Sequence, residues 1–326
     1  MMLFTLENKH HKITFLNHGA SIYEWIVKSK NRNIVLTNKH LGDYRSPDTG
    51  FLGSTIGRVT NRIKDGRFSV HGQSYQLPKN FDQGQNAGHG GIEGFWNQPF
   101  NLISSAQSEL TFQYVETDGQ CGFPGDLTLN VTYTLTDETL KITYTAKTTQ
   151  ATPINITNHS YFNLSEEPTI LNHRLQADSS QYLLADETNA VTGDIIDGTN
   201  TPMDLRYKKP LHDLIYQPLT QTEQYQGLDH CFLFDKEKQI TLESEDLELT
   251  VTTSYPAVQI YTLGFPPKQA LKQSNKINPF HGIALECQFE TDAVNHSHFS
   301  NIILEPNETY KQYIEFTIKE GEFIHE

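Results

Sequence analysis

Apolar and polar residues alternate along much of the chain with a period of two, which is the pattern of a half-buried β-strand. The clearest run is Leu127–Leu135, where Leu, Val and Tyr alternate with Thr and Asn. Leu140–Ala146 repeats the pattern, and Asp137-Glu138 between the two runs fits a hairpin connection. The same alternation predicts strands in Lys12–Phe15, Phe68–Tyr75, Leu247–Thr253, Val258–Thr262, Ile283–Phe289 and Tyr313–Ile318.

Helical periodicity is nearly absent, and the best candidate for a helix is the short segment Pro210–Tyr216. Closely spaced strands with turn residues between them are typical of an all-β sandwich of two large antiparallel sheets. The pattern runs evenly through the 326 residues, without a linker or a repeat. We therefore expect residues 1–326 to form a single domain.

The formal net charge of −14 argues against nucleic acid or an anionic membrane as a partner, because phosphates attract Lys and Arg. Cys121, Cys231 and Cys287 are too few and too far apart for a disulfide framework or a zinc site. Residues 1–10 lack the pattern of a signal peptide, and no apolar stretch approaches the length of a membrane span. The cytoplasm is the simplest location, with a monomer as the default state.

Two segments combine glycine with residues that can bind a ligand. Gly57–Ile63 contains Arg58 and Arg62, and each arginine fits either a structural ion pair or a donor to sugar hydroxyls. Gly88–Gly94 carries His89 among glycines whose spacing fits neither a dinucleotide fingerprint nor a P-loop. His89 is therefore either a surface residue in a turn or a group that approaches a ligand closely.

Candidate acid and base groups lie on two predicted strands. Ile154–Leu164 reads as a strand rich in hydrogen-bonding side chains, and its His159 is either a proton donor or a core histidine bonded to the backbone. In Ile283–Phe289 the alternation turns Glu286 away from the apolar face, towards solvent or a cleft. Gln259 has the same relation to its own strand, and Asp229 precedes another apolar run.

Other chemistries fit the residues less well. His10-His11 and His296-x-His298 lack a matching cluster of further metal ligands, so we expect no metal. Asp229 and Glu286 form a carboxylate pair of the kind used by glycoside hydrolases, and the sequence spacing leaves that alternative open.

Taken together, the segments resemble the aldose 1-epimerase (galactose mutarotase) family. The resemblance runs in consecutive order from about Gly53 to the C-terminus, through seven blocks. They are GSTIGRVTNRI (53–63), GHGGIEGFW (88–96), DGQCGFPGDLTLNVTYTLT (118–136), NITNHSYFNL (155–164), VTGDIIDGTNTPMDLR (191–206), GLDHCFLF (227–234) and ALECQFETDAVN (284–295).

The resemblance implies a β-supersandwich with an open cleft and an enzyme that interconverts the α and β anomers of a free monosaccharide without a cofactor. It places the general acid at His159 and the general base at Glu286. It also implies a set of residues that bind the sugar: His89, Asp229, Arg62, Asn61, Tyr161 and Gln259.

The chain departs from the family pattern at a few positions. Gly88 stands where a leucine is usual, Thr291 stands where a proline is usual, and Ala190-Val191 replace a typical Ile-Pro. These departures affect loops and leave the implied acid and base in place. The alternatives to an epimerase of free sugars are a sugar-binding protein without activity, a glycoside hydrolase and an epimerase of a phosphorylated hexose.

Overall fold

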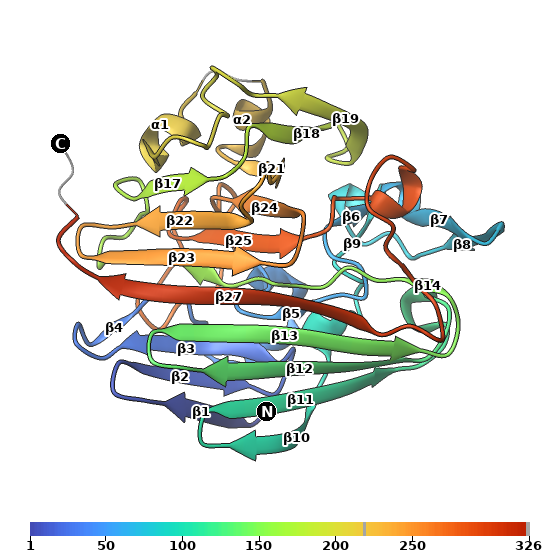
Figure 1. Ribbon diagram of the computed structural model, residues 1–326, viewed down its shortest axis with the longest axis horizontal. Helices are drawn as coiled ribbons and strands as arrows, with labels where there is room; N and C mark the ends of the chain where they lie inside the picture. Colours follow the sequence, from blue (N-terminus) through green and yellow to red (C-terminus); the bar gives the residue numbers. More distant parts are fainter. Residues whose placement is uncertain (218–219, 324–326) are drawn as a thin grey trace.

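The computed structural model describes residues 1–217 and 220–323, and its largest element is a nine-stranded antiparallel sheet (Figure 1). In spatial order its strands are β10 (Asn101–Ala106), β11 (Glu109–Glu116), β12 (Leu127–Leu135), β13 (Thr139–Thr148), β27 (Tyr310–Glu320), β23 (Leu247–Thr253), β22 (Gln239–Glu243), β17 (Arg174–Ala177) and β20 (Lys209–Pro210). Strand β27 lies between β13 and β23, so this sheet joins distant parts of the chain.

A six-stranded antiparallel sheet carries most of the polar strand residues predicted above. Its strands, in order, are β16 (Tyr161–Phe162), β25 (Ile283–Gln288), β24 (Ala257–Tyr261), β21 (Asp229–Leu233), β18 (Gln181–Ala185) and β19 (Val191–Asp197). A four-stranded sheet comprises β1 (Leu3–Glu7), β2 (His11–Leu16), β3 (Ser21–Val27) and β4 (Arg32–Asn33).

Short elements complete the fold. The two-stranded pairs are β5 (Thr55–Ile56) with β15 (Thr157–Asn158), β6 (Arg62–Ile63) with β9 (Ala87–Gly88), β7 (Arg67–Val70) with β8 (Gln73–Gln76), and β14 (Thr152–Pro153) with β26 (Ile303–Leu304). The α-helices are α1 (Leu211–Ile215) and α2 (Thr220–Tyr225). The 3₁₀ turns are Leu41–Arg45, Pro47–Thr49, Lys64–Gly66, Asp82–Gly84, Phe95–Asn97, Gln120–Gly122 and Ala293–Asn295.

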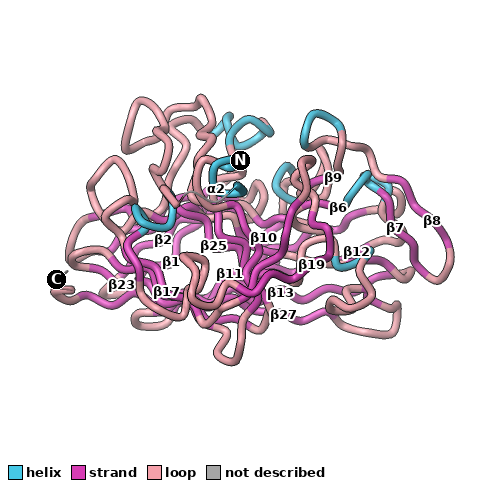
Figure 2. Tube along the Cα trace, turned by 90° about the horizontal axis from the view of Figure 1, so that it is seen from above, coloured by secondary structure: helices cyan, strands magenta, loops and turns pink. Residues whose placement is uncertain are grey.

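One hydrophobic cluster holds the three larger sheets together. It contains Trp25 from β3, Tyr133 from β12 and Leu285 from β25, each at most 1% exposed. Along β12 every second residue is buried, as the alternation predicted, because successive strand side chains point to opposite faces. The nine-stranded and six-stranded sheets therefore pack face to face, as predicted for a sandwich of antiparallel sheets, and Figure 2 shows long loops and helical turns gathered beside the layer of strands.

The described part of the chain contains no helix that combines the length and the apolar character needed to cross a lipid bilayer. The predicted helix at Pro210–Tyr216 is present as α1, whereas α2 had no clear signal in the sequence. The predicted strand ends agree with the structure to within a few residues in most cases.

Two predicted strands are wrong in detail. Phe68–Tyr75 is a hairpin, because His71 and Gly72 adopt positive φ angles of 49° and 80° and form a tight turn between β7 and β8. Ile154–Leu164 contains only the two-residue strands β15 and β16, because side chains take the place of ladder bonds. Asn158 Nδ2 donates to the Gly53 carbonyl at 2.8 Å, and Asn155 exchanges two hydrogen bonds with the backbone of Phe289.

Of the two roles considered for Arg58, the structure shows the structural ion pair. Its side chain is fully buried, and Nε lies 2.7 Å from Glu116 Oε2, which is also fully buried. Nη1 donates to the Pro124 carbonyl and to the Thr152 hydroxyl, and Nη2 donates to the Gly125 carbonyl. This network ties the segment between β5 and β6 to β11 of the nine-stranded sheet.

Replacement of Glu116 by Ala leaves the Arg58 charge buried without its counter-charge. We expect the free energy of unfolding to fall by about 3–5 kcal/mol, as for other broken buried ion pairs. Chemical denaturation measures this loss. Glu109→Ala, on the same strand but partly exposed, is the control and changes stability by less than about 1 kcal/mol. Equal effects of the two substitutions contradict a structural role for the Arg58–Glu116 pair.

Candidate functional site

A cleft of about 540 Å³ opens on the face of the six-stranded sheet that is turned away from the main core. It has the size and the mixed polar and aromatic lining of a small-molecule site. The structure brings together in this cleft every site residue that the family resemblance implied: Asn61, Arg62, His89, His159, Tyr161, Asp229, Gln259 and Glu286.

Strand register delivers the carboxylate to this cleft. Glu286 on β25 is paired directly with Gln259 on β24, so their side chains leave the same face of the sheet. The neighbours Leu285 and Ile260 point into the core instead. Glu286 is 2% exposed and Gln259 is 4% exposed. The alternation thus predicted the correct face, and the side chain points into a cleft rather than into bulk solvent.

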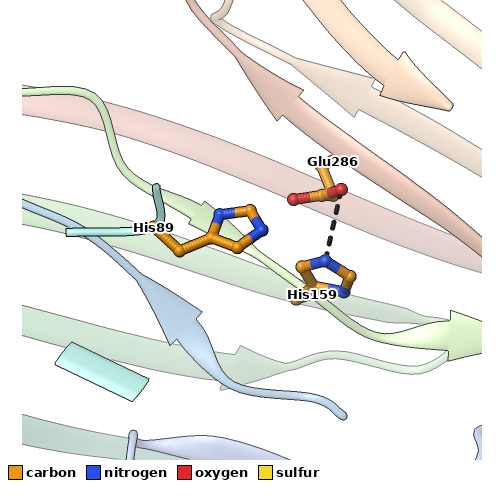
Figure 3. A group of neighbouring side chains, drawn as sticks. All are labelled: His89, His159 and Glu286. Atoms are coloured by element: carbon orange, nitrogen blue, oxygen red, sulfur yellow. Dashed lines mark ion pairs between the residues drawn. The ribbon is translucent and has the colours of Figure 1, made fainter. Parts of the chain in front are cut away.

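His159 lies in the connection between β15 and β16, where its backbone is bonded on both sides. Its N–H donates to the Ser54 carbonyl, and its carbonyl accepts from the Gly53 N–H, each at 2.9 Å. These hydrogen bonds hold the backbone from which the imidazole ring projects. The ring atom Nε2 lies 3.4 Å from Glu286 Oε1 (Figure 3). Nδ1 of His159 and Oε2 of Glu286 are buried without a hydrogen-bond partner among the described residues.

Burial governs the protonation of this pair. Desolvation lowers the pKa of His159 to about 4, because the imidazolium loses its hydration. Desolvation also raises the pKa of Glu286 well above its ordinary value; the negative charge of Asp229 adds to this effect and the positive charge of Arg62 opposes it. The two groups titrate as a unit. Above about pH 4, and up to the raised pKa of the carboxyl group, the pair holds one proton.

His89 is held in one tautomer by the backbone. The Asn61 N–H donates to His89 Nδ1 at 3.2 Å, and the His89 N–H donates to the Asn61 carbonyl at 2.9 Å. Desolvation, with smaller effects from His159 and Arg62, keeps the pKa of His89 well below its usual value, so the ring is neutral. Nδ1 accepts and Nε2 therefore carries the proton as a donor.

The glycines next to His89 serve this close packing. Gly90 has a φ of 77°, and a Cβ atom on it would lie 1.8 Å from the Gly57 carbonyl oxygen. Only glycine fits at that approach of two backbones. His89 is 8% exposed, so the structure excludes the alternative of a surface histidine in a plain turn.

The ring nitrogens of His89 and His159 and the carboxylate of Glu286 include ligand atoms that lie within 4.8 Å of one another. A metal ion there would need a lone pair from His89. Nδ1 already accepts from Asn61, and Nε2 carries the proton, so the ring has no free lone pair. These groups therefore fit a hydroxylated ligand better than a metal. The other histidines considered from the sequence, His10, His11, His296 and His298, are not part of this group.

Arg62 is the arginine of the Gly57–Ile63 segment that faces the cleft. Its Nε lies 3.0 Å from Asp82 Oδ2, and its Nη2 lies 3.9 Å from Asp229 Oδ2. Burial alone lowers the pKa of the guanidinium, but the charges of Asp229 and Asp82 outweigh that effect and raise it. Asp229 is also bonded to Gln259 Nε2 at 2.6 Å. The cleft therefore presents hydrogen-bond donors and acceptors side by side, and their contacts with one another hold them in place.

Aromatic residues form one part of the wall that sequence reasoning missed. The Phe51 ring lies 4.8 Å from the His89 ring and 5.7 Å from the His159 ring, between ring centres. Phe81 contacts His89 edge-to-face at 5.0 Å. Both belong to loops without periodicity, so no pattern in the sequence distinguished them from other loop residues. Tyr161, which was predicted, lies 4.9 Å from His159.

Comparison with protein families supports what the geometry suggests. Residues 2–317 match the family described as aldose 1-epimerase. The chain is 33% identical over 323 residues to the galactose mutarotase of Sus scrofa, covering 94% of this chain and 91% of the relative. It is 32% identical over 332 residues to the aldose 1-epimerase of Haemophilus influenzae, covering 97% and 95%.

Matches to solved structures with the same fold also cover nearly all of the chain. A crystal structure of an aldose epimerase homologue from C. elegans matches with a TM-score of 0.90 and 28% identity, and the match covers 98% of this chain and 99% of that one. A galactose 1-epimerase from Lactobacillus acidophilus matches with a TM-score of 0.87 and 27% identity, covering 98% and 94%. The similarity therefore extends over nearly the whole chain.

Proposed function

The chain belongs to the aldose 1-epimerase family, and we propose that it interconverts the α and β anomers of free aldoses such as galactose and glucose. Its relatives are isomerases, and so is this enzyme. The observation that supports the proposal most directly is the buried His159–Glu286 pair at 3.4 Å, with one unpartnered polar atom on each residue. Anomer exchange needs one group that accepts a proton and another that donates one.

In the proposed reaction, the Glu286 carboxylate takes the proton from the C1 hydroxyl. The C1–O5 bond breaks, its electron pair goes to O5, and O5 receives a proton from His159. The product is the open-chain aldehyde. Rotation about C1–C2 presents the other face of the carbonyl group, and the same steps in reverse close the ring. No atoms are gained or lost, and no covalent intermediate with the protein forms.

Burial sets the protonation state from which the ring-opening step must start. The step uses the ion pair, with the proton of the pair on His159, and it ends as a neutral pair with a proton on Glu286. The proton must therefore pass from Glu286 to His159 before the ring opens, which costs free energy. Desolvation lowers the pKa of His159 and raises that of Glu286, and both shifts favour the neutral pair. Arg62 opposes this effect at Glu286, because its charge stabilises the carboxylate that must act as the base.

The remaining polar residues of the cleft orient the sugar. Arg62 and the His89 Nε2–H group supply donors, and the Asp229 carboxylate supplies acceptors, which suits a ligand with a hydroxyl on nearly every carbon. We propose the following residues as the sugar-binding set: His89, Asp229, Arg62, Asn61, Tyr161 and Gln259. The single domain, the monomeric state, the cytoplasmic location and the lack of a cofactor stay predictions from the sequence.

Polarimetry tests the proposed function. Freshly dissolved α-galactose or α-glucose should relax faster with the protein than in buffer, to the same final rotation, because an enzyme does not change the equilibrium. The ratio of the two rates ranks the sugars. Relaxation at the buffer rate for both sugars contradicts the proposal and favours a sugar-binding protein or an epimerase of another aldose.

Glu286→Gln tests the proposed base. The amide nearly preserves the shape of the side chain but cannot take a proton, so we expect kcat to fall by about 10²–10⁴-fold. Polarimetry measures the loss, and circular dichroism checks the fold. Glu290→Gln is the matched control, because Glu290 follows the same strand and does not line the cleft. Full activity of Glu286→Gln contradicts this assignment.

The pH profile tests the shared proton. Below the lowered pKa of His159, a second proton enters the pair and removes the base, so activity falls at low pH. Since that pKa is about 4, we expect the acid limb of kcat/KM to lie well below the ordinary histidine value of about 6.5. Polarimetry across a pH series, corrected for the buffer rate, gives the profile. An acid limb at or above pH ~6.5 contradicts the neutral His159.

A further inference from the structure

We propose that Phe81 and Asp82 are positioning residues that hold the two sugar-binding groups Arg62 and His89 in place, an inference that rests on the proposed function. Both lie in the segment 80–88, where the chain departs from the family pattern. Neither residue contacts the His159–Glu286 pair in the described hydrogen bonds or ring contacts. Their effect on the reaction is therefore through the orientation of the sugar.

Asp82 is an acceptor for three different residues. Arg62 donates to it twice, from Nε at 3.0 Å and from Nη2 at 3.4 Å. Asn86 Nδ2 and Asn189 Nδ2 each donate to it at 2.9 Å. The Asp82 side chain is 8% exposed, so these contacts are sheltered from water. A carboxylate is the one side chain of this size that accepts from so many donors at once.

These contacts decide which way the Arg62 guanidinium faces. Asp82 occupies Nε and one hydrogen of Nη2, and Asn61 Oδ1 accepts from Nη1 at 3.2 Å. The planar group retains one free hydrogen on each Nη atom. Asp229 lies 3.9 Å from Nη2, too far for a direct hydrogen bond. Asp82 is therefore the partner that sets the plane of the fork, and the free N–H groups are left for a sugar hydroxyl.

Phe81 holds the neighbouring part of the wall. Its ring centre lies 5.8 Å from the Arg62 guanidinium carbon, and its edge-to-face contact with His89 is at 5.0 Å. A Cβ atom on Gly88 would lie 2.4–2.7 Å from atoms of the Phe81 ring. The ring thus occupies the space that a side chain at position 88 would need. Gly88, where a leucine is usual in the family, therefore leaves the space that the Phe81 ring fills.

Hydrogen bonds join the two ends of the segment that carries both residues. Asn80 Oδ1 accepts from the Gly88 N–H at 2.9 Å, and Asn80 Nδ2 donates to the Gly88 carbonyl at 3.0 Å. The Phe81 N–H and the Asn86 carbonyl are bonded at 3.0 Å. Asn189 adds a link to the loop after β18, and its own Oδ1 accepts from Gln224 Nε2 at 2.7 Å. The positions of Phe81 and Asp82 are therefore set by the loop rather than by the ligand.

Asp82→Asn tests the first half of the proposal. The amide loses the charge and turns an N–H group towards donors, so we expect KM to rise by about tenfold or more while kcat changes little. Polarimetry at several sugar concentrations separates the two constants. Asp65→Asn is the matched control, because Asp65 has a φ of 55°, similar to that of Asp82, but its side chain is exposed. An unchanged KM, or a loss of kcat alone, overturns the role of Asp82.

A double-mutant cycle distinguishes positioning from general damage. If Asp82 acts through Arg62, Asp82→Asn added to Arg62→Ala raises KM no further, and the two effects are not multiplicative. Multiplicative effects overturn the proposal. Activity of the unsubstituted enzyme in the same assay tests the proposed function separately from the positioning role. If that enzyme is active and the two substitutions have multiplicative effects on KM, only the positioning role is refuted. Thermal unfolding identifies any variant that is not folded, and Asp82→Glu then serves instead, with a raised KM and near-normal kcat expected.

The second half is tested by exchanging the ring for a side chain at position 88. Gly88→Leu alone clashes with Phe81, so we expect lowered stability and a raised KM. Phe81→Ala alone removes the support of His89 and also raises KM. The double variant Phe81→Ala/Gly88→Leu should recover at least part of the affinity and the stability lost by Gly88→Leu. A double variant no better than Gly88→Leu in both measurements overturns the role of Phe81.

Discussion

The site depends on the cost of burying two ionisable side chains in contact with each other. His159 and Glu286 are 3% and 2% exposed, and their facing atoms are 3.4 Å apart. Neither group keeps its ordinary pKa in that environment, so they share a proton instead of carrying separate charges. A rigid scaffold is needed to hold them, because small displacements would let water enter or separate the pair.

The six-stranded sheet and its connections supply that scaffold. Register between β24 and β25 sets Glu286 beside Gln259, and backbone bonds to Gly53 and Ser54 hold His159. The segment that carries His159 is hardly a strand at all, because its amide side chains bond to neighbouring backbone. Irregular backbone is thus placed where the cleft needs polar groups, while the regular strands of the larger sheet bury apolar ones.

Two arginines four positions apart show how little the local sequence determines the role of a residue. Arg58 is enclosed by Glu116 and backbone carbonyls and stabilises the fold. Arg62 is anchored by Asp82 from a different loop and faces the cleft. Both satisfy the rule that a buried guanidinium needs partners. The difference lies in which partners the fold brings to each, and those partners are 58 and 20 residues away in the sequence.

The sequence by itself determined the strands of the larger sheets and the face from which Glu286 projects, because a period of two follows directly from strand geometry. It also determined the family, because motif blocks in fixed order identify it. Only the tertiary structure decided that Glu286 faces a cleft, that His89 is a neutral donor, that Phe51 and Phe81 complete the wall, and that Asp82 anchors Arg62. Those facts depend on contacts between loops distant in the chain, and such contacts leave no periodic pattern in the sequence.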